Sequence, residues 1–125
     1  MTAPAWIDAV IGEFGRAAGV SGMALGGRGT AMLRFETGAV LRLEYTGEEL
    51  VMAMEVSAGD LRRLLAVSHP KARHGFKVRT GAVPKTGRQV LAVRLREREV
   101  TLPQLNAAFG TLWRLAGEIG GAPWA

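Results

Sequence analysis

The two histidines are the first residues to test as metal ligands or as a general base. His69 and His74 stand five positions apart, with Pro70 between them. This spacing prevents one helical face from presenting both imidazoles to a single metal ion. The chain has no cysteine and no HExxH sequence, so the sequence predicts neither a zinc site nor thiolate chemistry. We interpret both histidines as loop residues.

A phosphate-binding loop is the second chemistry to test, because Gly26, Gly27 and Gly29 surround Arg28. Phosphate loops follow a strand and precede a helix, and in nucleoside triphosphatases they end in lysine followed by serine or threonine. Here a strand is expected after the glycines, and Arg28 is not at the required position. We interpret this stretch as a linker.

The acidic residues do not form the paired carboxylates of an acid–base catalyst. The acids that alternate with apolar residues, as on the wet face of strands, are Glu36, Glu44 and Glu55. Glu97 and Glu99 interleave with Arg96 and Arg98, which suggests self-compensating surface charge. No serine or threonine has an evident base nearby. The sequence therefore predicts a protein that is not an enzyme, with no catalytic residue and no cofactor.

Length and composition indicate one globular domain over residues 1–125. A domain of this size hides roughly two thirds of its unfolded surface, and 48% of the residues are apolar while 22% are charged. No apolar run approaches the roughly 20 residues that span a bilayer. The stretch from Met1 to Asp8 lacks the basic start of a signal peptide. We expect a cytoplasmic protein that does not insert into membranes.

Charge is distributed unevenly along the chain. Residues 1–61 hold four Lys/Arg and eight Asp/Glu, a balance of −4, whereas residues 62–125 hold twelve and three, a balance of +9. Such asymmetry indicates a nucleic-acid patch, an acidic partner or a solvated surface on alternating strands.

A small basic nucleic-acid-binding module is therefore the alternative function. The residues that would form a phosphate track are Lys71, Arg73, Lys77, Arg79, Lys85, Arg88, Arg94 and Arg96. Against this function, the predicted hairpins lack the exposed aromatic residues of single-strand and RNA readers. No predicted helix carries basic residues in its first turns, as a recognition helix would.

Hydrophobic periodicity predicts three helices. An apolar stripe over residues 6–18 predicts the first. A second, short helix is capped by Ser57 and stopped by Pro70. Thr101 caps the last helix, and Gln104 completes a capping box with it.

Five strands lie between these helices. They are expected at residues 32–36, 41–45, 50–56, 76–80 and 89–96. Thr37-Gly38 suits a two-residue hairpin turn. The third strand is apolar on both faces and therefore needs two coverings. The order α-β-β-β-α-β-β-α predicts a small α+β domain in which helices pack on an antiparallel sheet.

Two segments resemble the class I chaperones of type III secretion systems, which are small dimeric α+β proteins with this order of elements. Trp6-Ile7-Asp8-Ala9-Val10-Ile11-Gly12-Glu13-Phe14, followed by Gly19-Val20, resembles the first helix of SycN-like chaperones. The stretch from Arg96 to Phe109, with its Thr-Leu-Pro start, then Leu112, Arg114-Leu115 and Glu118, resembles their last helix and the approach to it. These segments cover about a third of the chain.

The resemblance implies a cytoplasmic secretion chaperone that uses no nucleotide or metal. SycN-like proteins pair with a second small chaperone of the YscB type and hold the N-terminal region of a YopN-type gatekeeper in extended form for export. Chaperones of this class are usually acidic, whereas this chain has an isoelectric point near 10.7. An acidic client, an acidic partner chaperone or an arginine-rich genome would account for that departure.

Leu61, Leu64 and Leu65 share one face of the short second helix and are the predicted dimer interface. Burying each leucine fully stabilises by roughly 1.5–3 kcal/mol, enough to fix a marginal helix against a partner. The alternative is that this face covers the chain's own sheet.

The predicted client-binding residues are Trp6, Val10, Phe14, Met52 and Met54. The first three lie on the first helix, and the methionines would serve as adaptable contacts on the third strand. Two alternatives stay open. The methionine pair could be plain core, and an exposed strand edge could bind the client through its backbone.

Overall fold

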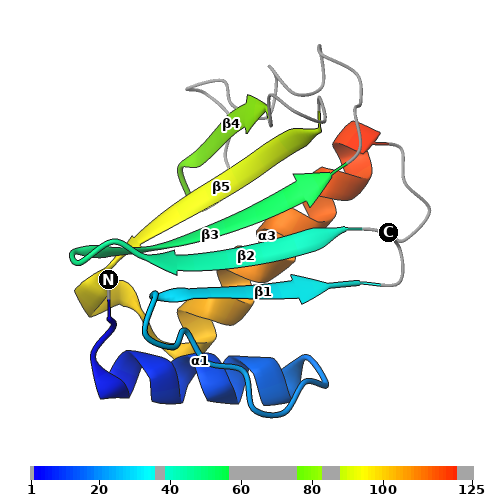
Figure 1. The fold of residues 1–125 in the computed structure, drawn as a ribbon. Helices are drawn as coiled ribbons and strands as arrows, with labels where there is room; N and C mark the ends of the chain where they lie inside the picture. The colour runs from blue at the N-terminus through cyan, green and yellow to red at the C-terminus, as the bar shows by residue number, and fades with distance from the viewer. Residues whose placement is uncertain (1, 36–38, 57–75, 83–87, 121–125) are drawn as a thin grey trace.

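The computed structural model describes residues 2–35, 39–56, 76–82 and 88–120 (Figure 1). The elements are α1 (Ala5–Ala17), β1 (Thr30–Arg34), β2 (Val40–Tyr45), β3 (Glu49–Val56), β4 (Val78–Ala82), β5 (Gln89–Arg96), the 3-10 helix η1 (Glu97–Glu99) and α3 (Leu102–Gly120). The predicted α+β architecture is confirmed. The helix predicted after Ser57 and the turn predicted at Thr37-Gly38 fall outside the described residues.

The five strands form one antiparallel sheet in the order β1-β2-β3-β5-β4. The register places Leu33 opposite Leu41, Leu41 opposite Met54 and Met54 opposite Leu91. Side chains alternate between the faces of a strand, so this row of four apolar residues lies on one face. Among the described strands, β1 and β4 form the two edges.

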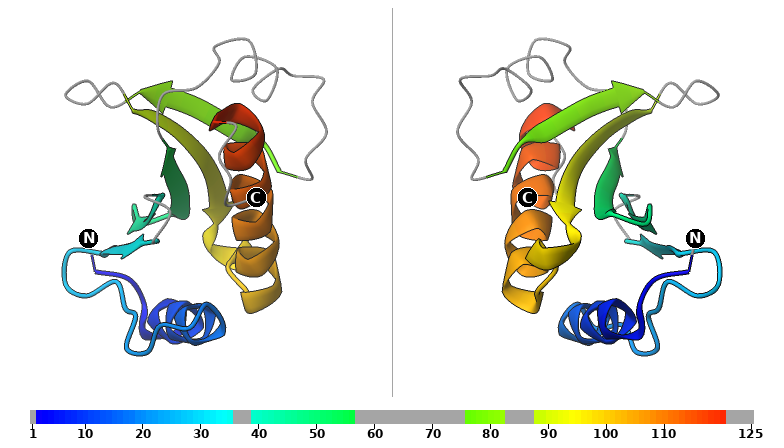
Figure 2. Two further views of the ribbon diagram at one scale, coloured as in Figure 1. Left: turned by 90° about the vertical axis from the view of Figure 1, so that its right-hand side faces the viewer. Right: turned by 90° about the vertical axis from the view of Figure 1, so that its left-hand side faces the viewer.

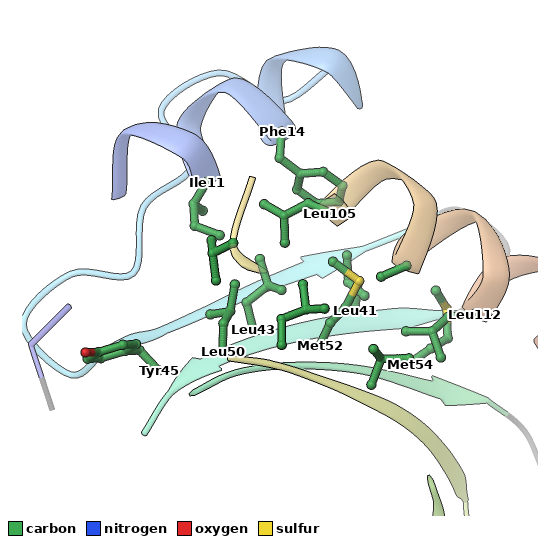
Figure 3. Packing of buried hydrophobic residues seen from close by; sticks show 14 of the residues in the cluster. Ile11, Phe14, Leu41, Leu43, Tyr45, Leu50, Met52, Met54, Leu105 and Leu112 are labelled. Atoms are coloured by element: carbon green, nitrogen blue, oxygen red, sulfur yellow. The ribbon is translucent and has the colours of Figure 1, made fainter. Parts of the chain in front are cut away.

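Both described helices lie on that same face, which we call the inner face (Figure 2). α3 packs across β3 and β5, and α1 packs beside α3. Leu41, Leu50 and Met52 of the sheet, together with Leu105 and Leu112 of α3, have no exposed surface. Figure 3 shows these side chains meeting between the helices and the sheet. The core therefore sits in this single layer of contact.

The two apolar faces of the third strand, β3, are buried to different extents. Leu50, Met52 and Met54 point inward and are fully buried. Val51 and Ala53 point to the opposite face, which we call the outer face, and both are half-buried. No helix within the described residues covers the outer face. The prediction that the strand needs two coverings is met on one side by α1 and α3.

The segment after α1 folds back against that helix. Gly15 allows the close approach, because a Cβ at this position would lie 2.6 Å from the Cβ of Met23. The carboxylate of Asp8 accepts a hydrogen bond from the Leu25 backbone N–H at 2.9 Å. Gly26 and Gly29 then adopt positive φ angles in a turn that leads into β1. A strand follows these glycines, as predicted, whereas a phosphate loop leads into a helix.

The hairpin between β2 and β3 and the start of α3 are fixed by side-chain hydrogen bonds. Tyr45 Oη donates to the Gly47 carbonyl at 2.9 Å and contacts Glu97 Oε2 at 3.4 Å. Thr101 Oγ1 accepts from the Gln104 backbone N–H at 3.3 Å, which confirms the predicted cap. None of the helices in the described part of the chain is long and apolar enough to span a membrane.

Candidate functional site

One row of side chains on α1 runs from the surface into the core. Trp6, Val10 and Phe14 stand four residues apart, so they share one side of the helix. Trp6 is 46% exposed, Val10 is half-buried and Phe14 is 1% exposed. An exposed tryptophan beside the buried side of a helix is a candidate contact for another chain.

The inner end of that row joins a group of aromatic rings. Phe14 meets Phe109 of α3 edge to face, with ring centroids 5.7 Å apart. Phe109 stacks on Phe35, with centroids 5.8 Å apart, and Trp113 lies 5.0 Å from Phe35 and 5.9 Å from Phe109. We call these four residues the aromatic cluster.

The aromatic cluster is only partly hidden. Phe35, Phe109 and Trp113 are each half-buried, and only Phe14 beneath them is fully covered. Phe109 and Trp113 share a side of α3 because they are four residues apart, and Phe35 directly follows β1. The cluster therefore lies where α1, α3 and the end of the edge strand meet.

The edge strand extends this apolar surface. Ala31 and Leu33 point to the inner face of β1 but are half-buried, whereas Leu41 and Leu43 on the neighbouring strand are fully covered. As an edge strand, β1 offers backbone N–H and C=O groups to an incoming extended segment. Backbone pairing and apolar side-chain contact are therefore available side by side.

The residues predicted to bind a client divide into two groups. Trp6 and Val10 have exposed surface, but Phe14, Met52 and Met54 are at most 1% exposed. Met52 and Met54 lie beneath α3 (Figure 3), so the alternative that this pair is core is the correct one. Phe14 supports the aromatic cluster from beneath. The predicted interface residues Leu61, Leu64 and Leu65 lie outside the described residues.

Sequence reasoning missed three residues of this surface as a site: Phe35, Phe109 and Trp113. Phe109 was assigned to the apolar stripe of the last helix and Phe35 to a strand face. The available signal was the spacing of four between Phe109 and Trp113, which predicts adjacent aromatic rings on α3. Their contact with Phe35 depends on the docking of α3, which periodicity alone does not give.

Ion pairs join a few of the charged groups in the described structure. Glu55, 9% exposed, lies 3.6 Å from Arg42 and 3.5 Å from Arg88. No group of three or more His, Asp or Glu residues that could hold a metal ion occurs in the described ranges. Burial and the neighbouring Glu97 carboxylate raise the pKa of Tyr45 above its ordinary value of 10. The hydrogen bond between the Tyr45 hydroxyl and Glu97 raises the pKa further, as the smallest of these contributions.

Comparison with known protein families decides the identity of the chain. The family described as type III secretory system chaperone SycN matches residues 6–120. The chain belongs to this family. The resemblance seen in the first and last helices therefore extends over nearly the whole sequence of this SycN-family chaperone, and the family gives no support to the nucleic-acid alternative.

Solved structures share the fold of the SycN-family chaperone. A chain in the crystal structure of the ExsC–ExsE complex superposes with a TM-score of 0.76 at 21% identity, over 93% of this chain and 92% of that one. A chain in the HopA1–SchA chaperone–effector complex gives 0.73 at 15% identity, over 97% and 100%. The ExoT–SpcS complex from Pseudomonas aeruginosa gives 0.72 at 15%, over 94% and 99%. No curated protein sequence matches the chain.

Proposed function

We propose that this type III secretion chaperone binds the N-terminal region of a secreted gatekeeper or effector, of the YopN type, in the cytoplasm before export. The observation that carries the proposal is the family match over residues 6–120. The fold shared with chains from the ExsC–ExsE and HopA1–SchA complexes supports it, because the latter is described as a chaperone–effector complex.

The client segment would lie extended along β1 and place apolar side chains on the neighbouring surface. Backbone hydrogen bonds to an edge strand give affinity with few sequence demands. The half-buried rings of Phe35, Phe109 and Trp113, together with exposed Trp6, accept the client's apolar side chains. A client leucine that becomes fully buried there stabilises the complex by roughly 1.5–3 kcal/mol.

Holding the client in this way requires no chemistry from the chaperone. An extended segment pays its ordering entropy on binding and is kept from folding early. We therefore propose that the chain is not an enzyme.

A second subunit would complete the binding unit. We propose that Leu61, Leu64 and Leu65 form the contact with it. The subunit is either a second copy of this chain or a small YscB-like chaperone, as the resemblance implies for SycN-like proteins.

Co-expression with the products of neighbouring small open reading frames tests the proposal. We expect a stoichiometric complex with a secreted protein, retained by its N-terminal region. The variant Trp6→Ser should reduce the amount of client recovered, and Glu13→Ser is the matched control, since both residues are exposed on α1. Recovery of no client with the wild-type chain would contradict the proposed function. Equal recovery of client with both variants would contradict the proposed site.

A further inference from the structure

The outer face of the sheet carries an ordered arrangement that the proposed client site does not use. Strand pairing places Met32, Arg42, Ala53, Ala92 and Arg79 in one row across all five strands. The row begins with an apolar residue, ends with a basic one, and has two small alanines at its centre. An ordinary solvated face would carry long polar side chains at these central positions.

An apolar patch surrounds the two alanines. Val51 precedes Ala53 by two residues on β3, and Val90 precedes Ala92 by two on β5, so all four residues face outward. Each of the four is half-buried. Because the alanines are small, another backbone can approach the middle of the sheet closely. We call these four residues the outer patch.

Basic side chains flank the outer patch. The outward-facing basic residues of the strands are Arg34, Arg42, Arg79, Arg94 and Arg96, and the outward-facing acids are Glu44, Glu49 and Glu55. Glu55 is shared by Arg42 and Arg88, and Glu49 pairs with Arg94. Arg34 and Arg79 are exposed and form no ion pair with another described residue. The outer face therefore keeps an excess of positive charge.

The spacing of the flanking arginines suits a helix. Arg42 on β2 and Arg79 on β4 are three strands apart, about 14 Å at the usual interstrand spacing. A helix with its side chains is about 10–12 Å across. Acidic residues along both sides of such a helix would reach the two arginines while its apolar face rests on the outer patch.

The outer face is continuous with the edge to which the client is proposed to bind. Met32 of β1 is 48% exposed and lines a hollow of about 400 Å³ with Thr30, Arg42 and Glu44. A segment paired with β1 would turn every second side chain toward this hollow. A client that leaves the edge strand therefore meets Met32 first and the outer patch next.

We propose that the outer face binds an acidic amphipathic helix of the secreted client, centred on the outer patch and held by Arg34, Arg42 and Arg79. This inference rests on the proposed function and adds the chemistry of a second client segment. Of the three arginines, only Arg79 belongs to the basic stretch of residues 62–125. Nucleic acid fits less well, because the outward-facing positions of the described strands include no aromatic residue for stacking, and Glu44 and Glu55 lie among the arginines.

Two synthetic 18-residue peptides test this inference. One carries alanine and leucine on one helical face and glutamate along both sides, and the other has lysine in place of each glutamate. Fluorescence anisotropy should show binding of the glutamate peptide alone, weakened by salt. The double variant Arg34→Glu/Arg79→Glu should weaken binding about tenfold, since it turns two attractions into repulsions. Arg16→Glu, exposed on α1, is the control for a charge reversal away from the outer face and should leave binding unchanged.

Four results would overturn the inference. They are equal binding of the two peptides, unchanged binding in the double variant, tighter binding of a random-sequence oligonucleotide through the same arginines, and a change of oligomeric state in the double variant. Client recovery separates this inference from the proposed function. If Trp6→Ser loses client while Arg34→Glu/Arg79→Glu recovers as much as wild type, the outer face is excluded and the proposed function stands.

Discussion

Phe14 and Phe109 meet edge to face, with ring centroids 5.7 Å apart and ring planes at 77°, and this contact ties the first helix to the last. Phe14 is fully buried, whereas Phe109 is half-buried and carries Phe35 and Trp113 on its other side. The same ring pair therefore stabilises the fold and supports the surface to which we assign client binding.

Truncation of buried Phe14 and of exposed Trp6 should lower the stability of the protein by different amounts. We expect Phe14→Ala to lower the free energy of unfolding by about 3–5 kcal/mol, because it opens a cavity between α1 and α3. Trp6→Ala should lower it by about half as much or less, since nearly half of that side chain is already exposed. Urea denaturation measures both. Similar losses in the two variants would contradict the assignment of Phe14 to the core and Trp6 to the surface.

The glycines of the helices should respond in opposite directions to alanine. At Gly15 an added Cβ would lie 2.6 Å from the Met23 Cβ, so Gly15→Ala should destabilise the protein. At Gly12 an added Cβ would lie 3.6 Å from the Met23 carbonyl oxygen, and at Gly110 there is open space. Gly12→Ala and Gly110→Ala should therefore stabilise by up to about 1 kcal/mol through helix propensity. Thermal unfolding checks all three, and stabilisation by Gly15→Ala would show that the loop does not pack against α1 as described.

The phenol of Tyr45 should titrate above pH 10. Burial and then the Glu97 carboxylate raise its pKa, so the folded state holds the proton more tightly than the unfolded chain. The resulting stabilisation is fully present below pH 10 and is lost as the pH rises through the pKa of the folded protein. Tyr45 is the only tyrosine, so phenolate absorbance reports this group alone.

A variant without the Glu97 charge tests the cause of the raised pKa of Tyr45. Glu97→Gln should move the titration midpoint of Tyr45 down toward 10, because it removes the negative charge. Glu13→Gln, on exposed α1 surface, should leave the midpoint in place. A wild-type midpoint at or below 10 would contradict the described hairpin contact.

A single substitution that introduces a charge tests the proposed subunit interface. If Leu64 lies in a subunit interface as proposed, Leu64→Asp should break the dimer, because an unpaired carboxylate would then lose its water. Sedimentation or light scattering measures the change in mass. An unchanged mass would remove Leu64 from the proposed interface.

The sequence was sufficient to predict the described strands and the first and last helices because their signals are local. Alternation over the strands and the cap at Thr101 each depend on residues close together in the chain, and the described strands agree within about two residues at each end. Residues 50–56, apolar on both faces, form the central strand β3, between β2 and β5.

Residue roles at the surface were harder to predict because they depend on how distant elements dock. The sequence around Met52 does not show that α3 covers this side chain. The sequence around Trp113 likewise does not predict its contact with Phe35, 78 positions earlier in the chain. The strand order that brings β5 between β3 and β4 is likewise a long-range property. The outer patch follows from that order, since Ala53 and Ala92 become neighbours only through it.

Amide hydrogen exchange of the chaperone, with and without the bound N-terminal region of its client, tests the central claim most directly. We predict that client slows exchange in β1 and at the helix surfaces around Phe35, Phe109 and Trp113, while β4, the other edge among the described strands, serves as the internal comparison and changes less. Protection that leaves β1 and the aromatic cluster unchanged would show that the client binds elsewhere and would contradict the account.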